Sequence, residues 1–197
     1  MPTYKEICEM PFWKAVFERE HAYLADALSG CKTVLSVGCG PAMIERMLAE
    51  DGFEVTGMDV SEEALSGAPD SIRKVVGTAE MMDFPASSFD AAIYVASLQF
   101  ITDYEAALRE TARVLVPKGK LVAMLLNTDS QYFREQTADP ESYMRRIKHT
   151  DIFWMEAAMM ERFEIKVEYY MGITGERIFE SDDPKLASLF IVNGIRL

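Results

Sequence analysis

Two glycines and an aspartate stand at a spacing that suits a nucleoside ligand. Gly38 and Gly40 follow the apolar residues 34–37, and such a turn lets the backbone approach a ligand with no Cβ in the way. The helix expected next directs its N-terminal N–H groups and positive dipole end toward the turn. Asp59 ends the next apolar run about 20 residues later, where a carboxylate can accept both hydroxyls of a ribose. These signals predict a nucleoside-containing cofactor.

The segments that position these residues alternate between strand and helix. Continuous apolar runs predict strands, and apolar residues spaced three and four apart predict helices. We therefore expect parallel strands joined by right-handed crossover helices. The strands are expected at 32–37, 53–59, 72–77, 89–95 and 120–126, and the helices at about 11–29, 42–50, from Ser61 onward and 104–115, with a turn at 117–119.

The last third of the chain breaks this alternation. Residues 127–150 are polar, which predicts a loop with a helix near 141–147. A helix near 151–162 then precedes two strands, at about 163–171 and 186–196. Because only a short irregular segment joins these two strands, they are expected to pair antiparallel.

Composition favours one acidic globular domain. The chain has 197 residues, of which 49% are hydrophobic, and its net charge is −12. An acidic surface repels phosphate backbones, so no nucleic acid partner is expected. The basic run at residues 145–149 is the one candidate exception, and a solvated helix face is the favoured explanation for it.

Cysteine usage and hydropathy point to the cytoplasm. Cys8, Cys31 and Cys39 are an odd number without a Cys-x-x-Cys pair, so neither a disulfide framework nor a zinc site is expected. Residues 1–6 show no apolar core of a signal peptide. The longest apolar runs fall short of the ~20 residues that span a bilayer, so no membrane association is expected.

Four segments in this order and spacing resemble the class I S-adenosylmethionine-dependent methyltransferases, in particular their small-molecule, ubiquinone/menaquinone-biosynthesis-like group. They are residues 34–42, 56–61, 77–90 and 107–121, and the resemblance covers residues 32–126 well. It implies an α/β fold: a doubly wound, seven-stranded, mostly parallel Rossmann-like sheet with an antiparallel last strand. It also implies S-adenosylmethionine as cofactor. One domain is expected over 1–197, with the first helix and the 127–150 insertion as a lid.

The chain departs from the family pattern at several positions. The family usually has an acid at Ser36, near the methionine amino group, and a third glycine at Ala42. It often has an acid at Thr78 and a histidine pair at Gln99 and Phe100. Alanine is a mild change for glycine if φ stays negative. A serine hydroxyl attracts an ammonium less than a carboxylate does, so either cofactor affinity is reduced or another group substitutes.

Cofactor contacts are expected along the carboxyl ends of the first four strands. Packing is the alternative for the two residues that end the fourth strand, and an ordinary surface acid is the alternative for Glu80. Cys39 is interpreted as a small residue of the turn. The expected cofactor-binding residues are Ser36, Gly38, Cys39, Gly40, Asp59, Val60, Thr78, Ala79, Glu80, Tyr94 and Val95.

Substrate contacts and catalysis are assigned to four segments around this edge. Gln99 occupies a position that often faces the transferred methyl in the family, and His149 is a candidate base, with a structural histidine as the alternative. The expected substrate-binding residues are Trp13 and Phe17 on the first helix and Asn127 and Tyr132 after the fifth strand.

The sequence therefore predicts methyl transfer from S-adenosylmethionine to a small-molecule acceptor by in-line displacement, in a monomer or homodimer. The alternative is a non-catalytic protein that binds S-adenosylmethionine or S-adenosylhomocysteine. A nicotinamide-dependent dehydrogenase is disfavoured, because Met43 stands where its fingerprint needs a small residue. No metal-ligand spacing or nucleophile elbow occurs, so no metal is expected.

Overall fold

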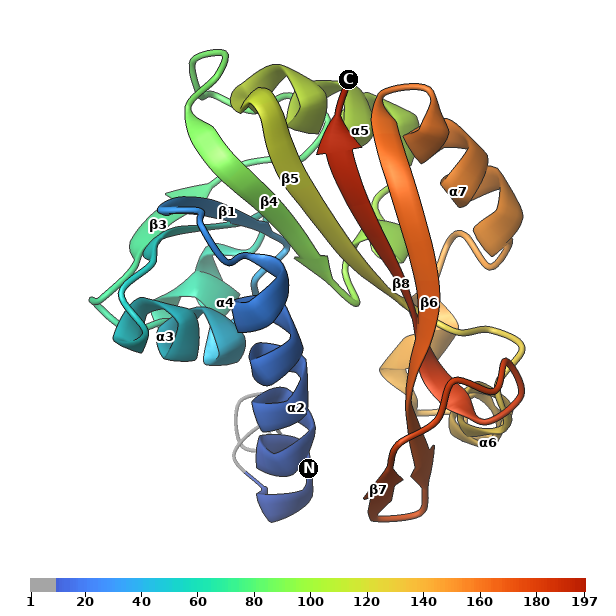
Figure 1. Ribbon diagram of the computed structural model, residues 1–197. Helices are drawn as coiled ribbons and strands as arrows, with labels where there is room; N and C mark the ends of the chain where they lie inside the picture. Colours follow the sequence, from blue (N-terminus) through green and yellow to red (C-terminus); the bar gives the residue numbers. More distant parts are fainter. Residues whose placement is uncertain (1–9) are drawn as a thin grey trace.

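The predicted alternation builds the parallel half of a single sheet. In the computed structural model, which describes residues 10–197, strands β1 to β5 run parallel in the order β3-β2-β1-β4-β5 (Figure 1). All five predicted parallel strands are confirmed. Their bounds are β1 Thr33–Val37, β2 Glu54–Asp59, β3 Arg73–Val76, β4 Phe89–Val95 and β5 Leu115–Leu126.

Three antiparallel pairings complete the sheet. Strand β8 (Ala187–Arg196) lies between β5 and β6 (Phe163–Thr174) and is antiparallel to both, as predicted for the last strand. The expected count of seven strands was wrong, because β7 (Arg177–Phe179) adds an eighth at the edge. This strand is three residues long and returns through a turn at Gly175, so no apolar run marks it in the sequence.

The helices agree with the sequence in the first two thirds of the chain and again at α7, where a helix was predicted near 151–162, and they differ in the segment between. A helix begins at Gln131, where Ser130 accepts a hydrogen bond from the backbone N–H of Phe133, and it was not predicted. The helix expected at 141–147 is a single 3₁₀ turn. The helices are α2 Pro11–Ala27, α3 Met43–Glu50, α4 Glu62–Ser66, α5 Tyr104–Val114, α6 Gln131–Ala138 and α7 Ile152–Met160, with 3₁₀ turns η1 Leu98–Phe100 and η2 Tyr143–Arg146.

The turn predicted at residues 117–119 lies inside β5 as an irregularity of the strand. Lys118 has φ +63°, and the pairing of β4 with β5 shifts between Phe89 and Ala91. A Cβ on Gly119 would come within 2.9 Å of the Val116 carbonyl oxygen. Pro117 and Gly119 therefore mark a kink within β5 rather than the start of that strand.

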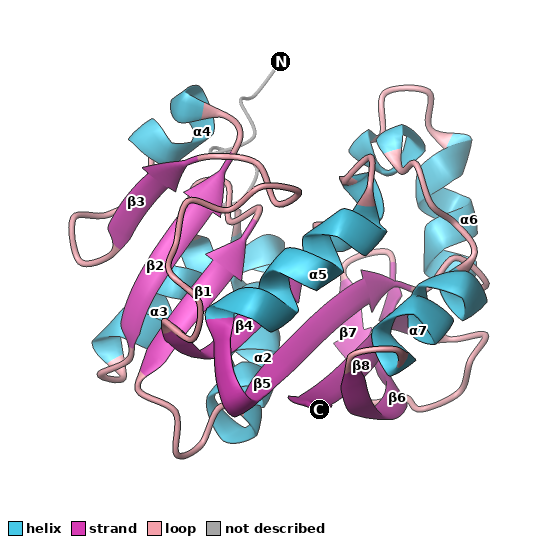
Figure 2. Cartoon of the chain, turned by 90° about the horizontal axis from the view of Figure 1, so that it is seen from above, coloured by secondary structure: helices cyan, strands magenta, loops and turns pink. Residues whose placement is uncertain are grey.

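Helices cover both faces of the sheet (Figure 2). On one face α5 and α7 bury Leu108 and Met155 against the sheet. On the other face α2, α3 and α6 bury Leu24, Leu48 and Tyr132. None of the helices in residues 10–197 is long and apolar enough to cross a bilayer.

Helix α2 is fastened to the sheet at its C-terminal end. Leu24 and Leu28 are fully buried, and the Lys120 ammonium on β5 donates to the carbonyls of Ala27 and Ser29 at 2.8 Å each. The last turns of α2 therefore belong to the core. The predicted lid over the site is therefore limited to the N-terminal turns of α2, which carry Trp13. This lid stays a prediction.

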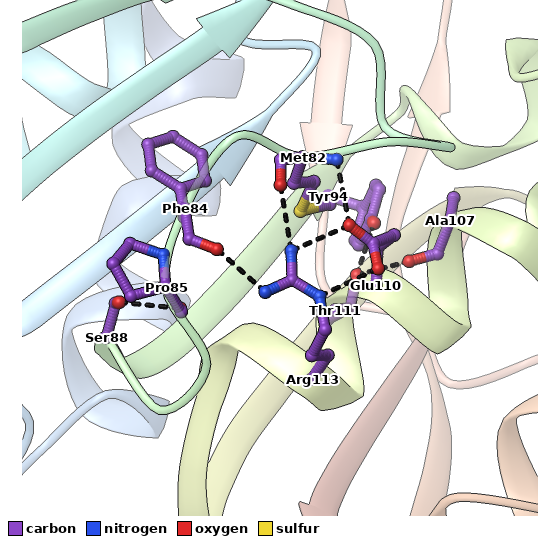
Figure 3. A network of polar contacts seen from close by, with 9 residues as sticks. All are labelled: Met82, Phe84, Pro85, Ser88, Tyr94, Ala107, Glu110, Thr111 and Arg113. Carbon is purple, nitrogen blue, oxygen red and sulfur yellow. Dashed lines mark hydrogen bonds and ion pairs between the residues drawn. The ribbon is translucent and has the colours of Figure 1, made fainter.

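An arginine on α5 holds the loop between β3 and β4 (Figure 3). The Arg113 guanidinium donates to the carbonyls of Met82 at 2.8 Å and Phe84 at 2.7 Å. It also bonds both carboxylate oxygens of Glu110, at 2.7 and 2.8 Å, and Glu110 accepts from the Met82 N–H. Arg113 holds the pKa of Glu110 below its usual range. This network fixes the segment that follows Glu80.

Replacing Arg113 tests how far this loop depends on one side chain. In Arg113→Ala two carbonyls and the Glu110 carboxylate lose their donor, and unsatisfied groups of this kind cost about 1–3 kcal/mol. We expect the free energy of unfolding in urea to fall by at least that much. Arg109→Ala, an exposed arginine on the same helix, is the control and is expected to change it by less than about 0.5 kcal/mol. Equal losses in the two variants would contradict this assignment.

Candidate functional site

The glycine turn after β1 is bonded to the end of β2. The N–H of Gly38 donates to the Met58 carbonyl at 2.7 Å, and the N–H of Gly40 donates to the Asp59 carboxylate at 2.9 Å. The other oxygen of Asp59 accepts from the N–H of Ser61 at 2.9 Å. The predicted glycine–aspartate pair is therefore one bonded unit at the carboxyl edge of the parallel strands, where open α/β sheets bind ligands.

Three residues of this turn have left-handed backbone conformations. Gly38, Gly40 and Ala42 have φ values of +73°, +54° and +57°. The condition under which alanine is a mild change for glycine, a negative φ, is not met at Ala42, so the alanine carries a strain of about 1–2 kcal/mol that a glycine would avoid. Gly38 is further constrained, because a Cβ there would lie 2.7 Å from the Cβ of Ser97.

A small hollow of about 80 Å³ opens at this turn. Ligand pockets have roughly 300–1,000 Å³, so a nucleoside cofactor would fill this hollow with one end and lie along the open edge with the rest. One of the lining side chains is a carboxylate, Glu45. The lining residues are Phe17, Gly38, Cys39, Gly40, Pro41, Met43, Ile44, Glu45 and Val95.

Glu45 is the residue that the sequence analysis missed. It lies in the first turn of α3, is only 3% exposed, and accepts a 2.6 Å hydrogen bond from the Ser36 hydroxyl. Burial raises the pKa of Glu45, while the bonds from Ser36 and from its own N–H oppose this shift. The sequence pattern of an amphipathic helix does not distinguish Glu45 from its other polar residues, because only the fold brings Glu45 next to Ser36. A carboxylate thus stands beside the position where the family usually has its own acid.

A second carboxyl group, Glu20 on α2, is buried near Glu45. Glu20 is 6% exposed, and neither a hydrogen bond nor an ion pair is found for its carboxyl in residues 10–197. Burial raises the pKa of Glu20 to about 8, and the charge of Glu45 adds to this. The Tyr132 hydroxyl, which was predicted to contact substrate, is buried without a partner. Burial and the Glu20 charge raise the pKa of Tyr132.

The edge beyond Asp59 carries exposed apolar side chains. The N–H of Gly77 donates to the Asp59 carbonyl at 3.0 Å, which brings the 77–81 loop beside the end of β2. Val60 and Met81 are 70% and 79% exposed there. Of the predicted cofactor contacts in this loop, Thr78 is exposed, Ala79 is buried and Glu80 is half-buried. These residues form an open ledge next to the candidate ribose site.

One predicted cofactor contact packs into the interior instead. Tyr94 is fully buried, and its hydroxyl lies 2.6 Å from that of Thr111 on α5. Cys39 is half-buried: its sulfur packs close to Gly57, where an added Cβ would lie 2.8 Å from it, and burial raises the pKa of its thiol. Packing thus accounts for Tyr94, whereas Cys39 and Val95 both line the hollow.

Gln99 and His149 form a structural connection rather than a free acid–base pair. The Gln99 amide donates to the Leu126 carbonyl at 3.1 Å and accepts from the Leu126 N–H at 2.7 Å. His149 Nε2 lies 2.9 Å from the Ile101 carbonyl, and its ring meets Tyr104 edge-on. Neither Gln99 nor His149 lines the hollow, and a catalytic role for either residue stays a prediction.

The remaining predicted substrate contacts fall on two sides of the edge. Asn127 donates to the carbonyls of Pro184 and Ala187, and these two hydrogen bonds are sufficient to explain why its side chain is buried. Phe17 lines the hollow, and its ring centroid lies 6.1 Å from that of Trp13. Phe17 therefore lies at the hollow with Trp13 beside it, whereas Asn127 lines a separate hollow of about 630 Å³. Cys8 lies outside the described residues.

Comparison with known proteins identifies the family. Residues 35–123 match the methyltransferase domain family. The chain is also 32% identical over 164 residues to a ubiquinone biosynthesis O-methyltransferase from Xanthomonas oryzae pv. oryzae, covering 76% of this chain and 68% of that protein. The chain belongs to the class I S-adenosylmethionine-dependent methyltransferases. The resemblance drawn from four sequence segments is thereby confirmed.

Other methyltransferases share the fold over different lengths. A ubiquinone biosynthesis O-methyltransferase from Idiomarina loihiensis is 33% identical over 110 residues, 52% of this chain and 45% of that relative, so the match spans about half of its length. A solved structure from Thermotoga maritima, a possible histamine N-methyltransferase, has a TM-score of 0.76 and 21% identity, and it covers 92% of this chain and 89% of that one. At that identity the likeness concerns the fold.

As a methyltransferase, the chain has donors and acceptors that fit S-adenosylmethionine. Asp59 offers carboxylate oxygens for a ribose, and Val60 and Met81 offer apolar surface for a base. The buried Glu45 carboxylate suits a cationic end in the hollow. In residues 10–197 no cluster of histidine, cysteine or acidic side chains could hold a metal.

The buried Glu20 predicts an unusual dependence of stability on pH. Its pKa rises on folding from 4.5 to about 8, so the unfolded state loses its proton first and the free energy of unfolding falls between these pH values. The expected decrease is on the order of a few kcal/mol. Urea denaturation at pH 5, 6.5 and 8 measures it.

Glu20→Gln cannot titrate, so we expect its stability to decline less with rising pH than that of the wild type. Glu18→Gln, at an exposed position of the same helix, should follow the wild-type slope. Parallel slopes in wild type and Glu20→Gln would show that Glu20 titrates normally.

Proposed function

We propose that this protein transfers a methyl group from S-adenosylmethionine to a small-molecule acceptor. The observation that carries the proposal is the Asp59 carboxylate, which is bonded to Gly40 at the mouth of a hollow that contains a second, buried carboxylate, Glu45. Family membership supports the reaction class, and the geometry supports the way in which the cofactor would lie.

The cofactor would extend along the carboxyl edge of the sheet. Asp59 keeps lone pairs that its two backbone bonds do not use, and these would accept the ribose hydroxyls. The base would rest on the ledge of Val60 and Met81, and the amino acid end would enter the hollow beside Gly38. When bound, the sulfonium supplies a methyl group that is already activated.

Because the methyl is activated, the protein acts chiefly by orientation and by excluding water. Holding two reactants in line contributes several kcal/mol to lowering a barrier. Phe17 and Val95 form the apolar wall of the hollow, and Trp13 extends that wall along α2. Gln99 and His149 secure the chain between β5 and α7 and so keep the rim rigid. No specific contact favours a non-catalytic role.

The acceptor is proposed as a small molecule, by analogy with relatives whose names place them in ubiquinone biosynthesis. The net charge of −12 supports a partner other than nucleic acid. A monomer or homodimer stays our prediction for the oligomeric state.

Calorimetry with S-adenosylmethionine, S-adenosylhomocysteine and NAD tests the cofactor. We expect both adenosyl sulfur compounds to bind and NAD to bind at least tenfold more weakly, because Met43 and the short hollow suit a dinucleotide poorly. Incubation with labelled S-adenosylmethionine and a panel of phenolic and amine acceptors then tests transfer. Tighter binding of NAD than of S-adenosylhomocysteine would rule out the proposed cofactor.

Replacement of Asp59 tests the ribose site. A charge-assisted hydrogen bond contributes about 1.5–3 kcal/mol, so Asp59→Ala should weaken S-adenosylhomocysteine binding at least about tenfold. Glu63→Ala, an exposed acid in the neighbouring helix α4, is the control. Circular dichroism should show that both variants are folded. Unchanged affinity in a folded Asp59→Ala protein would place the ribose elsewhere.

A further inference from the structure

Two buried carboxyl groups, Glu45 at the glycine turn and Glu20 near it on α2, have no cationic partner among residues 10–197. Glu45 and Glu20 are 3% and 6% exposed, and neither forms an ion pair with a residue between positions 10 and 197. Burying a carboxylate without a cation is costly, and proteins keep such groups where a ligand or metal pairs with them. The described residues offer no metal cluster that would explain them.

A buried hydroxyl without a hydrogen bond lies near Glu20. It is the Tyr132 hydroxyl on α6, which is fully buried and has no hydrogen-bond partner in the described part of the chain. The Glu20 charge raises the pKa of this phenol, so the hydroxyl lies near Glu20. Glu20 on α2 therefore interacts electrostatically both with Glu45 on α3 and with Tyr132 on α6.

Glu45 is the member of this group that reaches the hollow. It lines the hollow together with Gly38, Gly40 and Val95. Its Oε1 accepts one bond from Ser36, whereas a carboxylate has about four lone-pair sites. Acceptor capacity therefore remains for a donor that enters from the glycine turn.

We propose that Glu45 is the counter-ion of the primary ammonium group at the amino acid end of the methyl donor. This inference rests on the proposed function, because it names the residue that binds one end of the proposed cofactor. The Ser36 hydroxyl orients the Glu45 carboxylate. A carboxylate on helix α3 thus takes over the charge that position 36 lacks.

The ligand distinguishes Glu45 from a merely structural acid. S-adenosylhomocysteine keeps the ammonium but has no sulfonium, so it isolates the proposed contact. Its analogue with a hydroxyl in place of the amino group removes the charge and keeps the rest of the molecule. Calorimetry with both compounds on wild type and Glu45→Gln forms a complete cycle between protein and ligand.

We expect the wild type to bind S-adenosylhomocysteine at least tenfold more tightly than the hydroxyl analogue. In Glu45→Gln this preference should fall to less than about threefold, with the loss confined to the amino compound. Glutamine has the same shape and still accepts from Ser36, so the melting temperature should change little. Glu50→Gln, exposed at the end of the same helix, should keep the wild-type preference.

A double variant moves the negative charge from helix α3 to position 36 on strand β1. Ser36→Asp combined with Glu45→Gln should recover most of the lost affinity for S-adenosylhomocysteine, whereas Ser36→Asn with Glu45→Gln should not. This rescue separates a charge contact from a packing effect.

Three results would overturn the proposal. They are equal affinity of the wild type for the two compounds, an equal loss for both in Glu45→Gln, and wild-type affinity in Glu45→Gln. If the wild type binds neither compound, the proposed function fails as well, and the failure is seen before any variant is made.

Discussion

The hydrogen bonds between the glycine turn and the end of β2 set the geometry of the whole edge. Gly38 and Cys39 both donate to the Met58 carbonyl, and Gly40 donates to Asp59. These bonds exist because β1 and β2 pair in parallel and end at the same level, with Val37 opposite Met58. The turn then starts α3 at a fixed angle, which is what brings Glu45 back to the strand it left.

The site contains charge that the fold does not require. A core of this size is stabilised by apolar burial on two faces of the sheet, and the buried acids Glu20 and Glu45 subtract from that stability. Residues that lower stability and still occupy the centre of a candidate site are typical of binding regions, where selection acts on the ligand-bound state. Helix α2 carries residues of both kinds. Glu20 is a buried acid, and Leu24, one turn later, belongs to the apolar core.

Several residues with catalytic side chains serve the scaffold instead. Gln99 and His149 connect loops through backbone carbonyls, and Arg113 holds the loop that leads from the candidate site into β4. Such rigidity has a functional consequence, because a transfer that depends on alignment needs fixed walls more than a proton acceptor. The hydrogen-bond network thus gives Gln99, His149 and Arg113 a structural role that residue type alone did not reveal.

The sequence by itself determined the alternating strands, the glycine turn, Asp59 and the antiparallel last strand, because these follow from local periodicity and spacing. It did not reveal α6, which begins at a capping serine, or the edge strand β7, which follows a tight turn. It also did not reveal the left-handed φ of Ala42 at the start of α3. Only the tertiary structure brought Glu45 to Ser36 and Glu20 near Glu45. A buried acid on an amphipathic helix has no sequence signal of its partner, since that partner is set by how separate helices pack on one sheet.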